Sequence, residues 1–224
     1  MKITAYFRKY EKDKMKGFVD LYVNGTIHIK NAKLLEGPDG LFVGMPQKLN
    51  ENGFKDVITF LSKNFSEQVL EATLAARNSA EKTASIGDAS GLFCTPHVTR
   101  LDNPSGSVKA LASLTVRESK DAETSAFTIA DIHVVEHNKH LFASMPSVPG
   151  KNPDDPYTEL CAFTESNKDF YNGLIVSKAM DALGIEKKPK LDERVGEAKE
   201  KKEKAEPKAP KDSKKKEKNE ERAE

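Results

Sequence analysis

Hydrophobic and polar residues alternate along two stretches of the chain, and each stretch ends in a segment with helical spacing. Turn-forming Gly, Asn and Pro separate the four strands predicted in the first stretch, which are 17–24, 26–37, 41–46 and 54–61. Apolar residues in 66–77 then recur at helical spacing, and Ser62 or Ser66 is placed to cap the start of this helix. The pattern predicts antiparallel strands followed by one helix.

The second stretch has the same order of elements. Strands are predicted at 107–116, 126–137, 140–146 and 157–164. A helix follows at about 167–183, and Gly184 is placed to end it. The differences in spacing between the two stretches fall in predicted turns, where insertions are tolerated. This agreement predicts two copies of one fold.

A heptapeptide is shared by the two stretches: "GLFVGMP" at 40–46 returns as "HLFASMP" at 140–146. The recurring residues are Leu41, Phe42, Met45 and Pro46 in the first copy and Leu141, Phe142, Met145 and Pro146 in the second. Both runs are almost continuously apolar, which predicts strands buried on both faces, with Phe42 and Phe142 in the core. Each proline should mark the end of its strand, because it cannot donate to the ladder.

The repeat divides the chain into four predicted parts. They are a first domain at 1–77, a linker at 78–96, a second domain at 97–185 and a tail at 186–224. The linker is small and polar, and the tail has almost no apolar residues, so we expect the tail to be disordered. Its Lys and Glu residues are interleaved, which is typical of a solubilising segment.

Composition narrows the class of protein. The chain has 224 residues, of which 37% are hydrophobic, and no apolar run reaches the roughly 18 residues of a membrane span. The charged start, "MKITAYFRKYEKDKMK", does not resemble a signal peptide. Cys94 and Cys161 are expected as free thiols. These features indicate a cytoplasmic protein without a membrane partner.

The small net charge of +1 conceals an asymmetry. Residues 187–224 hold 15 Lys or Arg and 11 Asp or Glu, which leaves 21 basic and 24 acidic residues in 1–186. The part predicted to fold is therefore mildly acidic. A nucleic-acid surface on it would have to gather its cations locally, because phosphate contacts dominate non-specific affinity.

Motifs for catalysis and metal binding are weak. The sequence contains no G-x-S-x-G, H-E-x-x-H or phosphate-binding loop, so we expect no enzyme and no cofactor. His133, His137 and His140 are close in sequence, but four residues of a strand span about 13 Å, which disfavours a shared metal ion. Asp131 beside His133 is more typical of a solvated strand face, and Cys161 is expected in the core.

The run "KALASLTV…FTIADIHVVEHNKHLFASMPS" at 109–147 resembles the SpoVG family, known as septation protein G, and "KGFVDLYVNGTIHIKNAKLLEGPDGLFVGMP" at 16–46 resembles the same region more loosely. The resemblance implies an α+β fold with two tandem small domains, each a curved antiparallel sheet followed by a C-terminal helix. Family members pair through their sheets, which implies that the two copies pair as an internal pseudo-dimer. A lone copy would have a modest core, so pairing is physically reasonable.

The resemblance also implies function. Family members are non-enzymatic regulators of septation and sporulation, and several bind DNA or RNA. The basic residues of the family pattern are only partly present here: Lys48 matches one of them, and Lys63 and Lys168 are nearby substitutes, so these three are the candidates for nucleic-acid contacts. Among the strand aromatics, Tyr22 alone stays open as a base-stacking residue. The alternative is a protein–protein adaptor in cell division control, without direct nucleic-acid binding.

Overall fold

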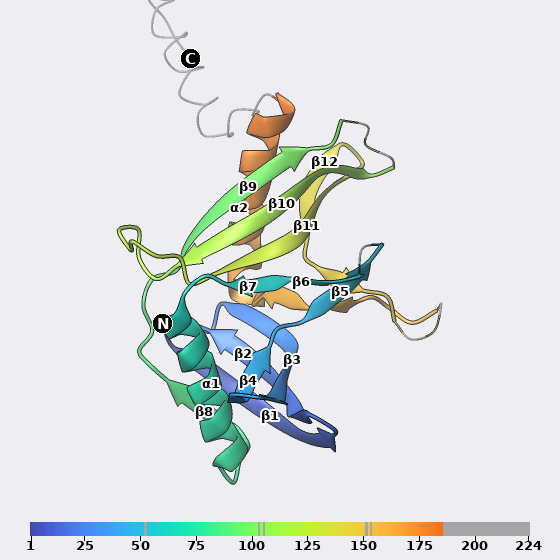
Figure 1. The fold of residues 1–224 in the computed structure, drawn as a ribbon. Helices are drawn as coiled ribbons and strands as arrows, with labels where there is room; N and C mark the ends of the chain where they lie inside the picture. The colour runs from blue at the N-terminus through green and yellow to red at the C-terminus, as the bar shows by residue number, and fades with distance from the viewer. Residues whose placement is uncertain (52, 103, 105, 151, 153, 186–224) are drawn as a thin grey trace, which may run out of the picture. The chain divides into compact units, whose positions relative to one another are not determined.

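Figure 1 shows the computed structural model of the chain, which describes residues 1–185 except 52, 103, 105, 151 and 153. The predicted disordered tail at 186–224 lies outside the described residues. Two antiparallel sheets, each covered by a helix, dominate the described part. Every strand pairing between described residues is antiparallel. The α+β class expected from the sequence is therefore correct.

The first sheet has the order β15-β3-β2-β1-β8, and β4 also pairs with β3. Its strands are β1 (Ile3–Lys12), β2 (Met15–Val23), β3 (Ile27–Gly37), β4 (Gly40–Gly44), β8 (Thr83–Ile86) and β15 (Cys161–Phe163). Alternate residues of the three central strands, such as Ile3, Leu21 and Ile29, are fully buried. Helix α1 (Lys63–Asn78) packs on this apolar face against β1 and β8. The opposite face of the sheet is left to polar and aromatic side chains.

The second sheet has the order β12-β11-β10-β9, and β7 also pairs with β11. Its strands are β7 (Ile58–Phe60), β9 (Phe93–Arg100), β10 (Val108–Arg117), β11 (Phe127–His137) and β12 (His140–Ser144). Helix α2 (Glu165–Leu183) packs against β9 and β12. Two short hairpins complete the described elements: β5 (Gln47–Asn50) with β6 (Gly53–Asp56), and β13 (Ser147–Val148) with β14 (Thr158–Glu159).

Each sheet receives one strand from the other half of the chain. Strand β7, which leads into α1, pairs with β11 so that Phe60 lies opposite Phe127. Strand β15, which leads into α2, pairs with β3 so that Phe163 lies opposite Ile27. The predicted strands 54–61 and 157–164 are thus each divided into a hairpin strand and an exchanged strand.

Backbone hydrogen bonds at the two crossings match. At the first crossing Val57 N donates to Pro46 O at 3.1 Å, and Val57 O accepts from Ala130 N at 2.8 Å. The equivalent residues at the second crossing, with distances of 2.8 and 2.9 Å, are Leu160, Pro146 and Lys30. The carbonyl of each heptapeptide proline therefore accepts a hydrogen bond from the residue at which the chain crosses to the other sheet.

The heptapeptides lie on strands that are less buried than predicted. Phe42 is 46% exposed and Phe142 is 38% exposed, so the prediction that both lie in the core is wrong. Strands β4 and β12 each pair on one side only, and their residues alternate between the two faces. Met45 is buried, Met145 is partly buried, and Leu41 and Leu141 pack against the core from its margin. Pro46 and Pro146 are both buried.

The helix ends agree with the sequence. Ser62 precedes α1 and accepts a hydrogen bond from the Phe65 backbone at 3.3 Å, which satisfies one free N–H of the first turn. Gly184 follows α2 with φ of 68°, the left-handed conformation that glycine adopts without strain. No helix within the described residues is long and apolar enough to cross a membrane.

Five strands of the structure were not predicted from the sequence, namely β1, β5, β8, β9 and β13. The N-terminal segment forms β1, and the stretch 78–96, predicted as a linker, contains β8 and the first residues of β9. Strand β8 pairs with β1, so that Ile86 lies opposite Ile3 and Ala84 opposite Ala5. It is thus an edge strand of the first sheet, and its small residues need little apolar surface to pair there.

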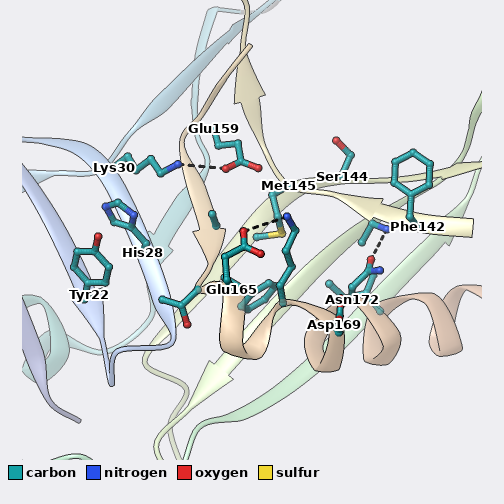
Figure 2. Close-up of a pocket in the computed structure, with 16 residues that line it drawn as sticks. Tyr22, His28, Lys30, Phe142, Ser144, Met145, Glu159, Glu165, Asp169 and Asn172 are labelled. Carbon is teal, nitrogen blue, oxygen red and sulfur yellow. Dashed lines mark hydrogen bonds and ion pairs between the residues drawn. The ribbon is translucent and has the colours of Figure 1, made fainter. Parts of the chain in front are cut away.

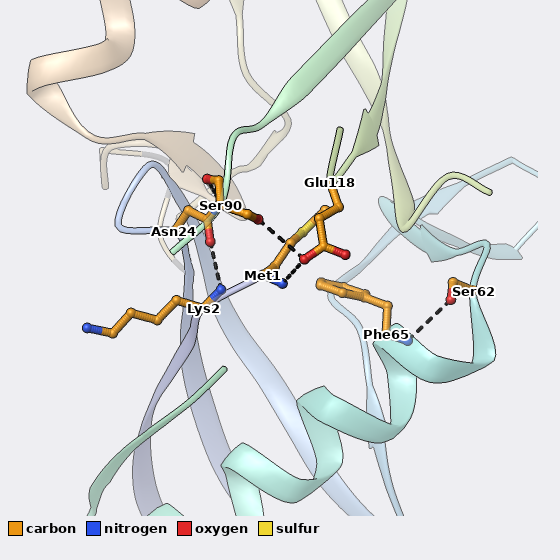
Figure 3. A network of polar contacts seen from close by, with 7 residues as sticks. All are labelled: Met1, Lys2, Asn24, Ser62, Phe65, Ser90 and Glu118. Atoms are coloured by element: carbon orange, nitrogen blue, oxygen red, sulfur yellow. Dashed lines mark hydrogen bonds and ion pairs between the residues drawn. The ribbon is translucent and has the colours of Figure 1, made fainter. Parts of the chain in front are cut away.

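A polar network near the N-terminus joins residues far apart in sequence (Figure 3). The amino group of Met1 forms an ion pair with Glu118, which also accepts from Ser90 Oγ at 3.3 Å. Asn24 accepts from the Lys2 backbone at 2.7 Å and donates to the Ser90 carbonyl at 2.6 Å. The network fixes β1 and the turn after β2 against the segment that leads into β9.

Candidate functional site

The three lysines predicted to contact nucleic acid each form an ion pair with a carboxylate. Their partners are Asp131 for Lys48 at 2.6 Å, Glu67 for Lys63 at 3.4 Å and Glu165 for Lys168 at 3.5 Å. Lys48 and Lys168 line different grooves, and Lys63 lines neither of these two. Exposed ion pairs contribute about 0–1 kcal/mol to stability, so a phosphate could replace Glu67 beside Lys63 or Glu165 beside Lys168. The three side chains do not make one cationic cluster.

A different surface gathers aromatic rings. Because β1, β2 and β3 bury every second residue under α1, the residues between them point to the opposite face. We call the rings on this side the aromatic face, and its members are Tyr6 and Tyr10 of β1, Phe18 and Tyr22 of β2, and His28 of β3. Tyr6 and Tyr10 are 45% and 44% exposed.

The rings of the aromatic face contact one another across the strands. Tyr22 and His28 are direct cross-strand partners, and their rings stack with centroids 4.1 Å apart and planes 12° apart. Tyr6 meets Tyr22 edge to face at 5.5 Å, and Tyr10 lies 5.4 Å from Phe18. Such pairs contribute about 0.5–1.5 kcal/mol each beyond area burial. The rings are therefore held in fixed orientations before any ligand arrives.

Cations lie among these rings. The Arg8 guanidinium lies 5.8 Å from the centre of the Phe18 ring. Its Nη2 donates to Asn31 Oδ1 at 2.7 Å and contacts Asp20 Oδ1 at 3.4 Å, which leaves donors on Nη1 and Nε for other acceptors. Lys33 lies directly across from Phe18 on β3 and is exposed. Phe18 thus lies between Arg8 and Lys33, and the Asp20 carboxylate lies opposite Tyr6 on the same face.

Burial keeps His28 neutral. Desolvation lowers the pKa of His28, opposed by Asp20, and its Nε2 is buried without a hydrogen-bond partner. Desolvation and the neighbouring Tyr6 raise the pKa of Tyr22. At neutral pH the stacked pair is therefore an uncharged aromatic surface.

The aromatic face leads into a groove with a volume of about 570 Å³. Figure 2 shows Tyr22 and His28 on one side of this groove, and Glu165, Asp169 and Asn172 of α2 on the other. Polar contacts hold its walls: Lys30 of β3 pairs with Glu159 at 3.2 Å, and the Asn172 side chain accepts from the backbone of Ala143 at 2.7 Å. The groove thus combines an aromatic wall with hydrogen-bonding groups.

The second sheet does not repeat the aromatic face. The cross-strand pair that corresponds to Tyr22 and His28 is Thr115 opposite Thr128, with the hydroxyls 3.5 Å apart. Leu111 lies opposite Thr99 on the second sheet, whereas Phe18 lies opposite Arg8 on the first. The two sheets therefore differ in the chemistry of their outer faces.

The remaining candidates are Asp131, His133 and the two cysteines. Asp131 accepts from Lys48 and lies 3.3 Å from His133 Nε2. Among the residues that the structure describes, no group of three or more His, Cys, Asp or Glu could hold a metal ion. Cys161 is fully buried, as predicted, and burial raises its pKa and that of Cys94 to about 12, so neither thiol is activated as a nucleophile.

Sequence reasoning found Tyr22 but missed its neighbours. The signal was present in β1, where Tyr6, Arg8 and Tyr10 alternate with the buried Ile3, Ala5 and Phe7. It was hidden because the charged N-terminal segment was not recognised as a strand. His28 was missed because only strand pairing shows that it stacks on Tyr22.

Comparison with known proteins gives the family of this chain. A sequence model of the SpoVG family matches residues 1–78. A septation protein SpoVG 1 of Listeria monocytogenes is 32% identical over 87 residues, which cover 38% of this chain and 85% of the relative. A septation protein SpoVG of Symbiobacterium thermophilum is 30% identical over 80 residues, 35% of this chain and 57% of the relative. No solved structure matched. The chain belongs to the SpoVG family.

Proposed function

We propose that 1–77 and 97–185 are two copies of one fold that pair within the chain as a pseudo-dimer. The exchanged strands β7 and β15 and the matched hydrogen bonds at the two crossings support this. So do Asn31 and Asp131, which occupy the same place in β3 and β11 with φ of 57° and 59° beside equivalent register shifts. Two unrelated halves have no reason to share these left-handed residues.

A cleavable chain tests the pairing. A protease site inserted between Asp88 and Ala89, which are both exposed, cuts the connection without removing a strand. After cleavage the two fragments should elute together at the size of the intact chain and separate only in denaturant. Fragments that elute as two independent folded monomers would overturn the pseudo-dimer.

We further propose that the protein is a non-catalytic regulator that acts by binding nucleic acid, in the septation processes named for its relatives. The observation that carries this is the position of Phe18 between Arg8 and Lys33 on the aromatic face. Cations supply contacts to phosphate, and rings supply contacts to bases or sugars. Because residues 1–186 are mildly acidic overall, cations that bind phosphate must be concentrated locally.

Binding should depend on salt in proportion to these contacts. In fluorescence anisotropy with labelled DNA and RNA, the affinity of the full chain should fall linearly on a log–log plot against salt concentration. The double variant Arg8→Gln/Lys33→Gln should bind more weakly and reduce the slope by about 2, since each lost phosphate contact removes about 1.

A matched control uses Lys63→Gln and Lys168→Gln, two lysines that lie near the basic positions of the family pattern. If these variants lose binding while Arg8→Gln/Lys33→Gln does not, the nucleic acid contacts the helix starts instead of the sheet. If the full chain binds no DNA or RNA at any salt concentration, nucleic-acid binding is wrong and the adaptor alternative takes its place.

A further inference from the structure

We infer that the ligand of the aromatic face is single-stranded nucleic acid, whose unpaired bases stack on the Tyr6–Tyr22–His28 ladder and reach the groove beside it. This rests on the proposed nucleic-acid function and adds the site and the type of strand. Three observations carry it: the geometry of the rings, the groups that line the groove, and the difference between the two sheets.

The ring ladder selects unpaired bases. Tyr22 and His28 are stacked nearly in parallel, and Tyr6 packs against Tyr22 from the side. A base can extend such a stack only if its own face is free. In a duplex the bases are stacked on one another and show only their edges in the grooves, whereas a single strand can turn its bases toward protein rings.

The groove offers partners for a base edge next to the ladder. His28 and Tyr22 form one wall, and Asn172, Glu165 and Asp169 face them from α2. Amides and carboxylates can bond the donors and acceptors that base pairing occupies in a duplex. The groove is about 570 Å³ in volume, so it has room for a base beside the stacked pair.

Charge around the rings fits a phosphodiester backbone. Arg8, which is paired with Asp20 at 3.4 Å, and Lys33 flank Phe18, and Lys30 lines the groove, paired with Glu159 at 3.2 Å. A strand that crosses β1, β2 and β3 along the row of Arg8, Phe18 and Lys33 would meet a ring between two cations. Single-strand binding folds use this combination of a cationic track and stacking rings.

The second sheet provides an internal comparison. Thr115 and Thr128 replace the stacked pair there, and Leu111 replaces Phe18. This face has no aromatic ladder, so it cannot stack bases in the same way. We therefore expect one single strand per chain, bound to the first sheet.

The experiment measures binding of the full chain to a labelled oligonucleotide of about 12 nucleotides, within the roughly 4–16 nucleotides covered by single-strand binding folds. The same sequence is compared as single-stranded RNA, single-stranded DNA, duplex, and a single strand with abasic sites. The intact single strands should bind best, one per chain, and abasic sites should weaken binding.

Substitutions then locate the contact. Tyr22→Leu keeps apolar volume but removes the ring, and it should weaken single-strand binding roughly 5- to 150-fold, as expected for one stacking contact. Tyr22→Phe, which keeps the ring, should retain binding. Thr115→Ala, at the matching place on the second sheet, should also leave binding unchanged. Circular dichroism and thermal melting check that every variant is folded.

A direct optical signal is available, because the chain has 5 tyrosines and no tryptophan. Base stacking on Tyr22 and Tyr6 should quench tyrosine emission, and Tyr22→Leu should lose most of this quenching. The inference is overturned if duplex and single strand bind equally and Tyr22→Leu has no effect, although the proposed nucleic-acid function would then stand. Absence of any binding would overturn both and leave the face to a protein partner.

Discussion

Replacing Phe127 by alanine should destabilise both halves of the chain together. Phe127 is fully buried in β11, opposite Phe60 of the exchanged strand β7. Its ring stacks on Phe65 of α1 with centroids 5.0 Å apart, and Phe65 meets Phe60 at 5.8 Å. One side chain from the second half thus supports both the exchanged strand and the helix of the first.

The magnitude follows from the buried ring. A buried aromatic side chain removes at least about 150 Å² from water, and at about 25 cal/mol per Å² this gives roughly 4 kcal/mol. That value lies within the 3–5 kcal/mol found for Phe→Ala in well-packed cores. A domain with about 5–15 kcal/mol of total stability would lose a large fraction of it.

Urea unfolding followed by circular dichroism and by tyrosine emission measures the loss. Phe127→Ala should lower the free energy of unfolding by about 3–5 kcal/mol. The two probes should still report one transition with an unchanged slope. Phe54→Ala is the control, because Phe54 is 73% exposed on β6 and should change stability by less than about 0.5 kcal/mol.

Two results would refute this reasoning. A loss below about 1 kcal/mol would mean that the ring is not packed as described. Two separate transitions, with only one moved by the substitution, would mean that the halves unfold independently and that the exchanged strands do not couple them.

Other consequences can be checked with single variants or labels. Gly17→Ala should cost about 1–3 kcal/mol in urea unfolding, since its new Cβ would lie 2.4 Å from the buried Phe7 ring; an unchanged midpoint would contradict this contact. Cys94 and Cys161, with pKa values raised to about 12 by burial, should react slowly with a thiol reagent at pH 8 and quickly in denaturant, and rapid labelling of the folded chain would argue against their burial. Burial lowers the pKa of His28 in the folded state, so the contribution of neutral His28 to stability is full above the unfolded pKa of about 6.5 and is lost as pH falls through the folded pKa. His28→Gln should therefore flatten the dependence of the unfolding midpoint on pH. Identical midpoint profiles of the natural chain and the variant between pH 5 and 7.5 would contradict this.

Much of the fold could be predicted from local pattern. The alternation in β2, β3, β10 and β11, the cap at Ser62 and the stop at Gly184 depend on neighbouring residues, and the structure confirms each of them. Strand exchange could not be predicted in this way, because a period of two tells which face of a strand is buried but not which strand lies beside it.

The candidate site was only partly predictable for the same reason. Tyr22 stood out on a strand with polar flanks, but its stacking on His28 and its contact with Tyr6 depend on the register of three strands. Phe42 and Phe142 were misplaced because an apolar run suggests burial on both faces, whereas β4 and β12 are each paired on one side. The local sequence predicts the chemistry of a residue, but it does not predict which residues lie beside it in space.

The exchanged strands also impose an order on synthesis. Strand β3 is complete at residue 37, but its partner β15 begins only at residue 161. At about 5–20 residues per second, the β3 edge waits roughly 6–25 s for this partner. An open edge can pair with the same strand of another nascent chain, which yields interlinked dimers. Crowded translation of this protein should therefore favour such dimers, and dilute expression should favour the closed single chain.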